Sequence, residues 1–201
     1  MPKTYDRAYF DRWYHDADTK ILMRDALERK VALAVAETEF VIGRRVASVL
    51  DVGCGEGLWR APLRKLRPRV RYTGIDGSEY AVRRHGRRRN LRLARFGAMS
   101  KLPGLYGPFD LVVCSDVLHY VPDAELAPGI RWIGRQCQGL AWVEVFAKED
   151  ETVGDHVEYH ERPARTYARL FRDAGLEAIG LYAFVPRSVL RTLTMFEKGG
   201  R

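Results

Sequence analysis

The chain has 201 residues and a mass of 23.0 kDa, and its formal net charge at pH 7 is +8. With 46% hydrophobic and 11% aromatic residues it can fill one substantial core, which excludes a largely disordered chain. No segment approaches the roughly 18 uninterrupted apolar residues of a membrane-spanning helix, and the N-terminus lacks the layout of a signal peptide. We therefore expect a soluble, cytoplasmic protein without a membrane partner.

The first 43 residues are predicted to be helical. Aromatic residues recur near one helical face in residues 5–14, which predicts a short amphipathic helix or lid. Apolar residues at steps of three and four then predict a longer helix over 20–42 that ends near Gly43. Most of the N-terminal aromatic side chains are interpreted as packing residues, and closure over a ligand is the alternative for Tyr9, Phe10, Trp13 and Tyr14.

From residue 44 onward strands and helices alternate, and neither a repeat nor a linker divides the chain. The strands are continuous apolar runs, as in a parallel sheet with both faces covered by helices. The predicted strands are 46–52, 70–75, 91–96, 109–114, 139–146, 176–185 and 192–197. The predicted helices are 56–66, 78–87, 122–136 and 163–174. We expect one α/β domain over residues 1–201, with a Rossmann-like, doubly wound sheet of seven strands, mostly parallel with one antiparallel edge strand.

Arginine accounts for most of the positive charge and is densest in the segment 83–95, "RRHGRRRNLRLAR". The solvated face of a surface helix is the favoured interpretation, and binding of RNA or of an anionic substrate is the alternative. The three cysteines are odd in number and lack the spacing of metal ligands, so we expect no disulfide, no metal site and buried, reduced thiols at Cys54, Cys114 and Cys137.

The most informative segment is residues 49–57, "VLDVGCGEG", at the turn from the first strand to the next helix. Glycines are needed at such a turn where the backbone adopts positive φ or where a ligand approaches it closely. The spacing differs from the Gly-x-Gly-x-x-Gly of dinucleotide sites. Two carboxylates, at Asp51 and Glu56, disfavour a pyrophosphate and favour a ligand that carries an ammonium or sulfonium group.

The chain resembles the class I S-adenosylmethionine-dependent methyltransferases at three motifs in the family's order. The first is the glycine segment, the second is "YTGIDGSEYA" at the end of the second strand, and the third is "FDLVVCSDVLHYV" at 109–121. The resemblance implies a methyltransferase with S-adenosyl-L-methionine as cofactor and S-adenosyl-L-homocysteine as product. It also implies that residues 44–201 form the cofactor-binding core and that residues 1–43 form its helical cap or lid.

The resemblance assigns a cofactor role to ten residues. Gly53, Cys54 and Gly55 would surround the methionine part, with Asp51 near its ammonium group. Asp76, followed by Gly77, would accept hydrogen bonds from the ribose, while the Cys114 carbonyl and Ser115 would line the amino-acid end. The family often has an acid for the adenine amino group where this chain has Ala98, so adenine contacts would come from the backbone or from apolar contact, around Ala98 and Met99.

His119, at the mouth of the site, is the candidate general base because its ordinary pKa suits proton transfer near neutral pH. Asp116 and Tyr120 are weaker candidates. The segment 154–163 carries His156, Tyr159 and His160, and is interpreted as a surface loop, with substrate binding as the alternative.

A small-molecule methyl acceptor is favoured because few residues lie outside the core fold. Nucleic acid is possible but not favoured, because "CSDVLHY" replaces the base-methylating signature. A protein that binds S-adenosylmethionine without catalysis is a further alternative, and a nicotinamide-dependent oxidoreductase is opposed by the glycine spacing. The acceptor atom and the oligomeric state are not encoded in a readable pattern.

Overall fold

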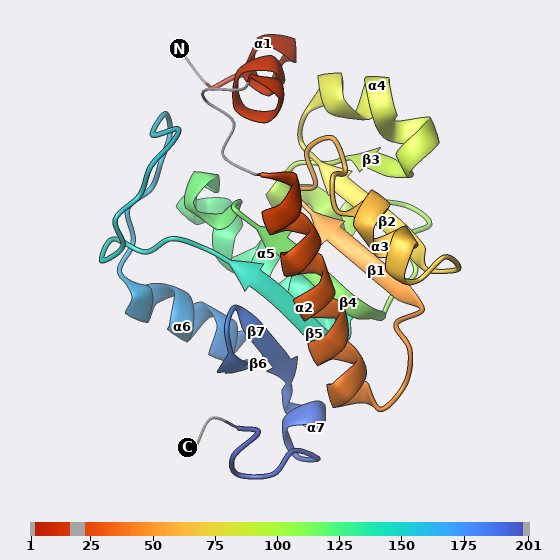
Figure 1. Ribbon diagram of the computed structural model, residues 1–201. Coiled ribbons are helices and arrows are strands. Elements are labelled where there is room, and N and C mark those ends of the chain that lie inside the picture. The colour runs from red at the N-terminus through yellow and green to blue at the C-terminus, as the bar shows by residue number, and fades with distance from the viewer. Residues whose placement is uncertain (1–2, 17–22, 199–201) are drawn as a thin grey trace.

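A computed structural model describes residues 3–16 and 23–198 of the chain. Its centre is a seven-stranded sheet with the strand order β3-β2-β1-β4-β5-β7-β6 (Figure 1). The strands are β1 Ser48–Val52, β2 Arg71–Asp76, β3 Leu91–Leu93, β4 Phe109–Ser115, β5 Cys137–Glu144, β6 Leu176–Gly180 and β7 Ala183–Pro186. β1 to β5 pair in parallel, whereas β7 pairs antiparallel with both β5 and β6. The predicted mostly parallel α/β sheet is confirmed.

Helices cover both faces of the sheet and bury two apolar layers. The helices are α2 Arg24–Ile42, α3 Arg60–Leu66, α4 Glu79–Arg89, α5 Asp123–Gln136, α6 Ala164–Asp173 and the short α7 Arg187–Leu190. One layer joins α2 and α3 to the sheet through residues such as Val31 and Leu63, and the other joins α5 and α6 through Ile130 and Phe171. The central strands β1, β4 and β5 are buried almost throughout, which explains their continuous apolar sequence.

Two predicted strands are wrong near the C-terminus. The run 176–185 contains a turn, so it forms the β6–β7 hairpin instead of one strand. Tyr182 takes a positive φ of 53° at this turn, and the neighbouring Leu181 side chain is 69% exposed. Residues 192–197 form turns instead of a strand, and Leu193 is their one buried hydrophobic residue.

The N-terminal prediction is correct over the described residues. The segment 5–14 contains α1 Arg7–Phe10 and a following turn of π-helix, Asp11–His15. The helix predicted over 20–42 runs from Arg24 to a left-handed C-cap at Gly43, while 20–22 lie outside the described residues. None of the described helices is both long enough and apolar enough to cross a membrane.

The chain order of the strands fixes where a ligand can lie. From β1 the chain proceeds outward through β2 to β3, and then returns to β4 on the other side of β1. The loops after β1 and β4 therefore diverge at the carboxyl edge of the sheet and leave a crevice between them. In Figure 1 the α1 segment and the long loop between β5 and α6 both lie at this edge, and α7 lies at the opposite end.

Candidate functional site

A cavity of about 890 Å³ opens at the carboxyl edge of the sheet. Its wall is built by the turns after β1 to β5, by the N-terminal segment and by the loop 145–163. This volume lies within the range of roughly 300–1,000 Å³ that is usual for small-molecule sites. Eight of the ten predicted cofactor residues line it: Asp51, Gly53, Cys54, Gly55, Asp76, Gly77, Met99 and Ser115.

The glycine turn after β1 is held tightly against the neighbouring strand. The backbone N–H groups of Gly53 and Cys54 both donate to the Ile75 carbonyl, at 2.8 and 3.1 Å. Gly53 and Gly55 have positive φ values of 70° and 53°. A Cβ at Gly53 would lie 2.3 Å from the Val117 side chain, so the turn tolerates no side chain here.

Asp51 is a buried carboxyl group at the end of β1. Only 2% of the residue is exposed, and the Tyr72 hydroxyl donates a hydrogen bond of 2.6 Å to its Oδ2. Burial raises the pKa of Asp51 to about 7, against the opposing effect of the Tyr72 hydrogen bond. A positively charged ligand group beside Asp51 would stabilise its ionised form, which is the electrostatic complement of an ammonium or sulfonium.

Asp76, at the end of β2, is oriented by the backbone on both sides. Its Oδ2 accepts from the Gly55 N–H at 2.7 Å and its Oδ1 accepts from the Ser78 N–H at 2.7 Å. Burial raises the pKa of Asp76, while these backbone hydrogen bonds lower it. The carboxylate therefore joins the glycine turn to the N-terminus of α4.

An acid that the sequence did not predict stands beside the turn after β3. Glu125 comes from the first turn of α5, and its Oε2 accepts a hydrogen bond of 2.8 Å from the Gly97 N–H. Glu125, Phe96 and Met99 all line the cavity, whereas Ala98 does not. A carboxylate is thus present next to the predicted adenine segment, although Ala98 itself carries none.

A second group of polar residues not predicted from sequence lies at the ends of β4 and β5. Glu144 receives a hydrogen bond from the Ser115 hydroxyl, and Lys30 of α2 places its Nζ 2.5 Å from the Glu144 Oε2. All three side chains line the cavity. Cys114 precedes Ser115 on β4 but is fully buried and does not line it.

His119 lies in the wall of the site without lining the cavity. The residue is completely buried, and its ring stacks on that of Tyr159 at 4.7 Å and meets that of Tyr120 at 4.3 Å. Its Nε2 lies 3.1 Å from an Asp116 carboxylate oxygen, close enough for an ion pair but not aligned as a hydrogen bond. The geometry supports a packing role for His119, and its role as a base stays a prediction.

The N-terminal aromatic residues form one side of the cavity. Tyr9, Phe10, Trp13 and Tyr14 all line it. Phe10 is buried and stacks on Tyr80 of α4, which anchors the segment to the core. The Tyr14 hydroxyl reaches so far over the glycine turn that a Cβ at Gly55 would lie 2.6 Å from it. Packing and coverage of the cavity are therefore combined in the same residues.

The cysteines show no sign of nucleophilic chemistry. All three are free and buried, and burial raises the pKa of each thiol, in Cys137 to about 12. Among the described residues no three His, Cys, Asp or Glu side chains form a cluster that could hold a metal ion. Besides the Cys54 thiol, the titratable groups that line the cavity are carboxylates, tyrosines, two lysines, Arg95 and His160.

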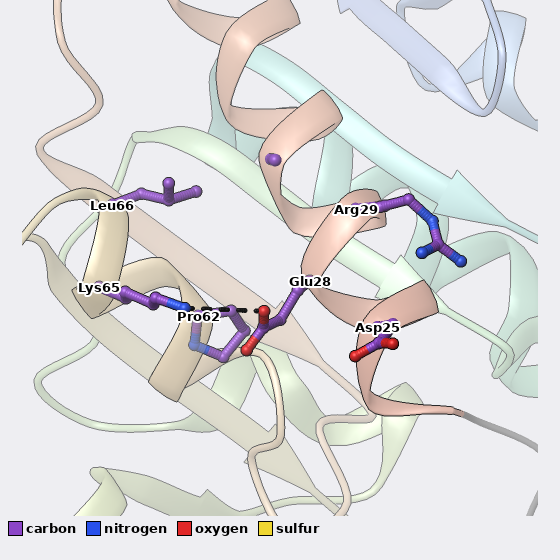
Figure 2. A pocket seen from close by; sticks show the side chains of 7 residues that line it. Asp25, Glu28, Arg29, Pro62, Lys65 and Leu66 are labelled. Carbon is purple, nitrogen blue, oxygen red and sulfur yellow. Dashed lines mark ion pairs between the residues drawn. The ribbon is translucent and has the colours of Figure 1, made fainter.

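A second hollow, of about 410 Å³, lies between α2 and α3 (Figure 2). Two of its charged residues, Lys65 and Glu28, form an ion pair with charged atoms 3.7 Å apart (Figure 2). It is more open to solvent than the main cavity and holds none of the predicted site residues. We therefore assign the ligand site to the cavity at the sheet edge.

Comparison with known proteins gives the same picture as the geometry. Residues 50–131 match a family model described as a methyltransferase domain. A malonyl-acyl-carrier-protein O-methyltransferase of Legionella pneumophila is 37% identical over 76 residues, which is 36% of this chain and 26% of that protein. The chain thus spans about a quarter of the length of this curated relative.

Among solved structures, the magnesium protoporphyrin IX methyltransferase of Synechocystis with bound S-adenosylhomocysteine is 19% identical, with a TM-score of 0.63. The match covers 90% of this chain and 96% of that one. The cyclase SpnF is 24% identical, with a TM-score of 0.57, over 84% of this chain and 63% of that one. These solved structures show that the chain has the fold of known methyltransferases, and the family model extends the likeness to the sequence of residues 50–131.

Proposed function

We propose that the protein transfers a methyl group from S-adenosylmethionine to a small-molecule acceptor. The observation that carries this proposal is the convergence of the glycine turn, the buried carboxyl of Asp51 and the half-buried carboxyl of Asp76 in one cavity. The N-terminal aromatic residues and the loop 145–163 line other parts of the same cavity. The volume of about 890 Å³ suits a cofactor together with a compact acceptor.

The residues of the cavity fit the parts of the cofactor one by one. Asp76 would accept from the ribose hydroxyls, and Asp51 would lie near the amino-acid ammonium. Lys30 and Ser115, which both contact Glu144, would bind the amino-acid carboxylate. Glu125 would accept from the adenine amino group in place of the acid that is missing at Ala98, beside Phe96 and Met99.

The cofactor would supply a methyl group on a positively charged sulfur, so the electrophile needs no further activation. The protein's contribution would be to hold the acceptor in line with that methyl group and to exclude water, which can lower a barrier by roughly 7–11 kcal/mol in favourable cases. The N-terminal aromatic residues provide the water-excluding wall on one side. A general base is needed only for an acceptor that must lose a proton during the transfer.

The resemblance in fold leaves a second candidate function open. One structural neighbour is named as a cyclase, so the fold also supports proteins that are not named for methyl transfer. A member that binds the cofactor without transferring its methyl group would bind S-adenosylmethionine and yield no labelled product with any acceptor. An acceptor screen with radiolabelled methyl donor separates these two functions.

Calorimetry with S-adenosylmethionine, S-adenosylhomocysteine and NAD tests the cofactor assignment. We expect binding of the first two and none of NAD. Asp76→Ala should weaken both by about 1–3 kcal/mol, because charged hydrogen bonds to the ribose are lost. Asp173→Ala, a change of the same type at an exposed position of α6, serves as the control and should bind normally. Equal affinity in the Asp76 variant would remove the ribose assignment.

A further inference from the structure

One end of the cavity contains a cage of tyrosines that holds a positive charge. The Lys3 Nζ lies 3.4 Å from the centre of the Tyr120 ring, 5.1 Å from that of Tyr5 and 5.3 Å from that of Tyr9. Distances within about 6 Å are those at which an aromatic face attracts a cation. We call these three rings, with the adjacent Asp155 carboxylate, the tyrosine cage.

The Lys3 ammonium is held by charge and by aromatic faces, without a well-formed hydrogen bond. Its Nζ lies 2.7 Å from Asp155 Oδ2, an ion-pair distance, yet the contact is not aligned as a hydrogen bond. Only 3% of the Lys3 side chain is exposed. Burial lowers the pKa of Lys3, while the carboxylates of Asp155, Asp116 and Glu158 act in the opposite direction. The site therefore carries more negative than positive charge around one buried cation.

The cage is part of the cavity that the proposed function assigns to the cofactor and the methyl acceptor. Lys3, Tyr5, Tyr9 and Tyr120 line the same cavity as the glycine turn, from the side of the β4 exit and the loop 145–163. Asp155 is part of that loop, which is connected to the β4 exit by a hydrogen bond from the Tyr120 hydroxyl to the Asp155 carbonyl, 2.8 Å long. Three separate segments of chain thus converge on the point where the ammonium lies.

Lys3 is the cage component whose side chain has no aligned hydrogen bond to hold it in place. Tyr5, by contrast, is attached to the core through its carbonyl, which accepts from the Ser78 hydroxyl at 2.6 Å. Tyr9 is attached through ring contacts with Phe10, and Tyr120 through its ring contact with the buried His119. Withdrawal of Lys3 would leave three rings and a buried carboxylate around a cation-sized space.

From this geometry we propose that the tyrosine cage binds an ammonium group of the methyl acceptor, and that Lys3 occupies it when no acceptor is bound. This inference rests on the proposed function, because it names the chemical class of acceptor for the same cavity. An incoming ammonium would replace the Lys3 ammonium against the same rings and carboxylates. The released lysine side chain would regain its hydration and rotamer freedom, which offsets part of the free-energy cost of displacing it.

The test uses the full chain with Lys3→Ala and a pair of probes of equal shape. Choline carries a quaternary ammonium, and 3,3-dimethylbutan-1-ol is its uncharged isostere. In calorimetry with the Lys3→Ala protein we expect choline to bind at least about tenfold more tightly than the isostere, as a desolvated cation–π site requires. The wild-type protein should bind choline more weakly, because its own lysine competes at an effective concentration on the order of millimolar.

Three controls make the result specific. Lys101→Ala removes an exposed lysine that does not line the cavity and should bind choline as the wild type does. Tyr120→Leu in the Lys3→Ala background should abolish the preference for choline over the isostere. Lys3→Gln should behave like Lys3→Ala, which protects the test against a change in folding in either variant. Substituting Nα-acetyl-lysine amide for choline distinguishes a lysine side chain from a small quaternary amine as the source of the ammonium.

The proposal would be overturned if choline and its isostere bound equally well. It would also be overturned if neither choline nor the lysine amide bound to either Lys3 variant. S-Adenosylhomocysteine is titrated into the same samples. If it binds while the ammonium probes do not, the cage fails and the proposed function stands. If the wild-type protein does not bind S-adenosylhomocysteine, the proposed function itself fails.

Discussion

At the scale of single residues, the buried carboxyl of Asp51 makes stability depend on pH. Its pKa is about 7 in the folded protein, against roughly 3.9 for an aspartate in an unfolded chain. Between these values the folded state binds more protons than the unfolded state. The contribution of Asp51 to the free energy of unfolding is therefore fully present below pH 4 and is lost as pH rises towards 7.

The prediction concerns Asp51→Asn, which keeps the size of the side chain and removes its titration. The wild-type free energy of unfolding minus that of the variant should be larger at pH 5 than at pH 7.5, by about 2 kcal/mol. Other carboxyls, such as Asp110 with its pKa lowered to about 2, titrate equally in both proteins and cancel in the difference. Denaturant unfolding at the two pH values measures it, and a difference independent of pH would contradict the assignment.

Glu125 leads to a prediction about the base of the cofactor. A carboxylate accepts from the adenine amino group but repels the carbonyl oxygen that hypoxanthine carries at the same position. We expect the wild type to prefer S-adenosylhomocysteine over S-inosylhomocysteine, and Glu125→Gln to reduce this preference about tenfold. The glutamine still accepts from the Gly97 N–H through its amide oxygen, so the turn should stay in place.

The two affinities are measured by calorimetry, and Glu28→Gln is the matched control. Glu28 lies on α2, where it is paired with surface cations away from the main cavity. An unchanged ratio of the two affinities in Glu125→Gln would limit Glu125 to holding the Gly97 turn against α5.

The residues that sequence could predict are those whose position follows from a strand end. Asp51 and Asp76 close neighbouring parallel strands, so their proximity follows from the topology alone. Glu125 lies 28 residues beyond Gly97, and Lys30 lies 114 residues before Glu144. Such pairs form only when helices α2 and α5 are packed in their final places, and no local spacing marks them.

At the scale of secondary-structure elements, Arg162 fastens the loop 145–163 to the β4 exit. It is 7% exposed, and its guanidinium donates to the carbonyls of Leu118 and Val121, at 3.1 and 2.6 Å. It also forms an ion pair of 2.7 Å with Asp123 at the start of α5. The loop that supplies Glu158 and Tyr159 to the cavity, and Asp155 to the ion pair with Lys3, is thus attached through one buried cation.

Arg162→Met should destabilise the protein by about 2–4 kcal/mol, because two buried carbonyls and the Asp123 carboxylate lose their donor. The measurement is denaturant unfolding, and Arg165→Met provides an exposed arginine nearby as the control. The control should change stability by less than about 0.5 kcal/mol. If Arg162→Met destabilised the protein no more than Arg165→Met does, Arg162 would contribute to stability through its aliphatic stem alone.

The C-terminal hairpin shows where apolar patterning stops being informative. Over 176–185 only Glu177 and Gly180 interrupt the apolar residues, and the prediction passed over Gly180 as a turn signal because the turn itself contains Leu181 and Tyr182 instead of a typical turn pair. Tyr182 is an uncommon residue at positive φ. Its backbone carbonyl accepts from the Val143 N–H at 2.8 Å, so pairing with β5 stabilises this conformation.

At the scale of the whole molecule, the reversal of strand order between β1 and β4 explains why one edge of the sheet collects the functional groups. The proposed cofactor part of the cavity is built from the turns after β1, β2 and β3, where Asp51, Asp76 and Met99 were predicted from sequence. The acceptor half combines the N-terminal segment with the loop 145–163, and these segments meet only in the folded chain. The cavity residues at the strand ends therefore follow from sequence, while those of the proposed acceptor site do not.

The net charge of +8 raises the question whether the protein binds nucleic acid, for which the exposed arginines of α4 would be the contact surface. Arg83, Arg84, Arg87 and Arg88 are exposed on this helix, and none of them lines the cavity. If the acceptor is a small molecule, this face is only a solvated surface. Replacing all four arginines with glutamine should leave the affinity for S-adenosylhomocysteine unchanged within about twofold, because long-range charge effects are screened in 0.15 M salt.

The same variant tests the nucleic-acid alternative directly. Wild type and variant are incubated with radiolabelled S-adenosylmethionine and total RNA, and label in the RNA is counted at 50 and 200 mM salt. We expect none with either protein. If the protein were an RNA methyltransferase that used this face, the wild type would label RNA and the variant would not. RNA binding by the wild type would also depend steeply on salt, because counterions are released from the phosphates. Such a result would mean that the methyl acceptor is RNA bound on the surface of α4 and not an ammonium compound bound in the tyrosine cage.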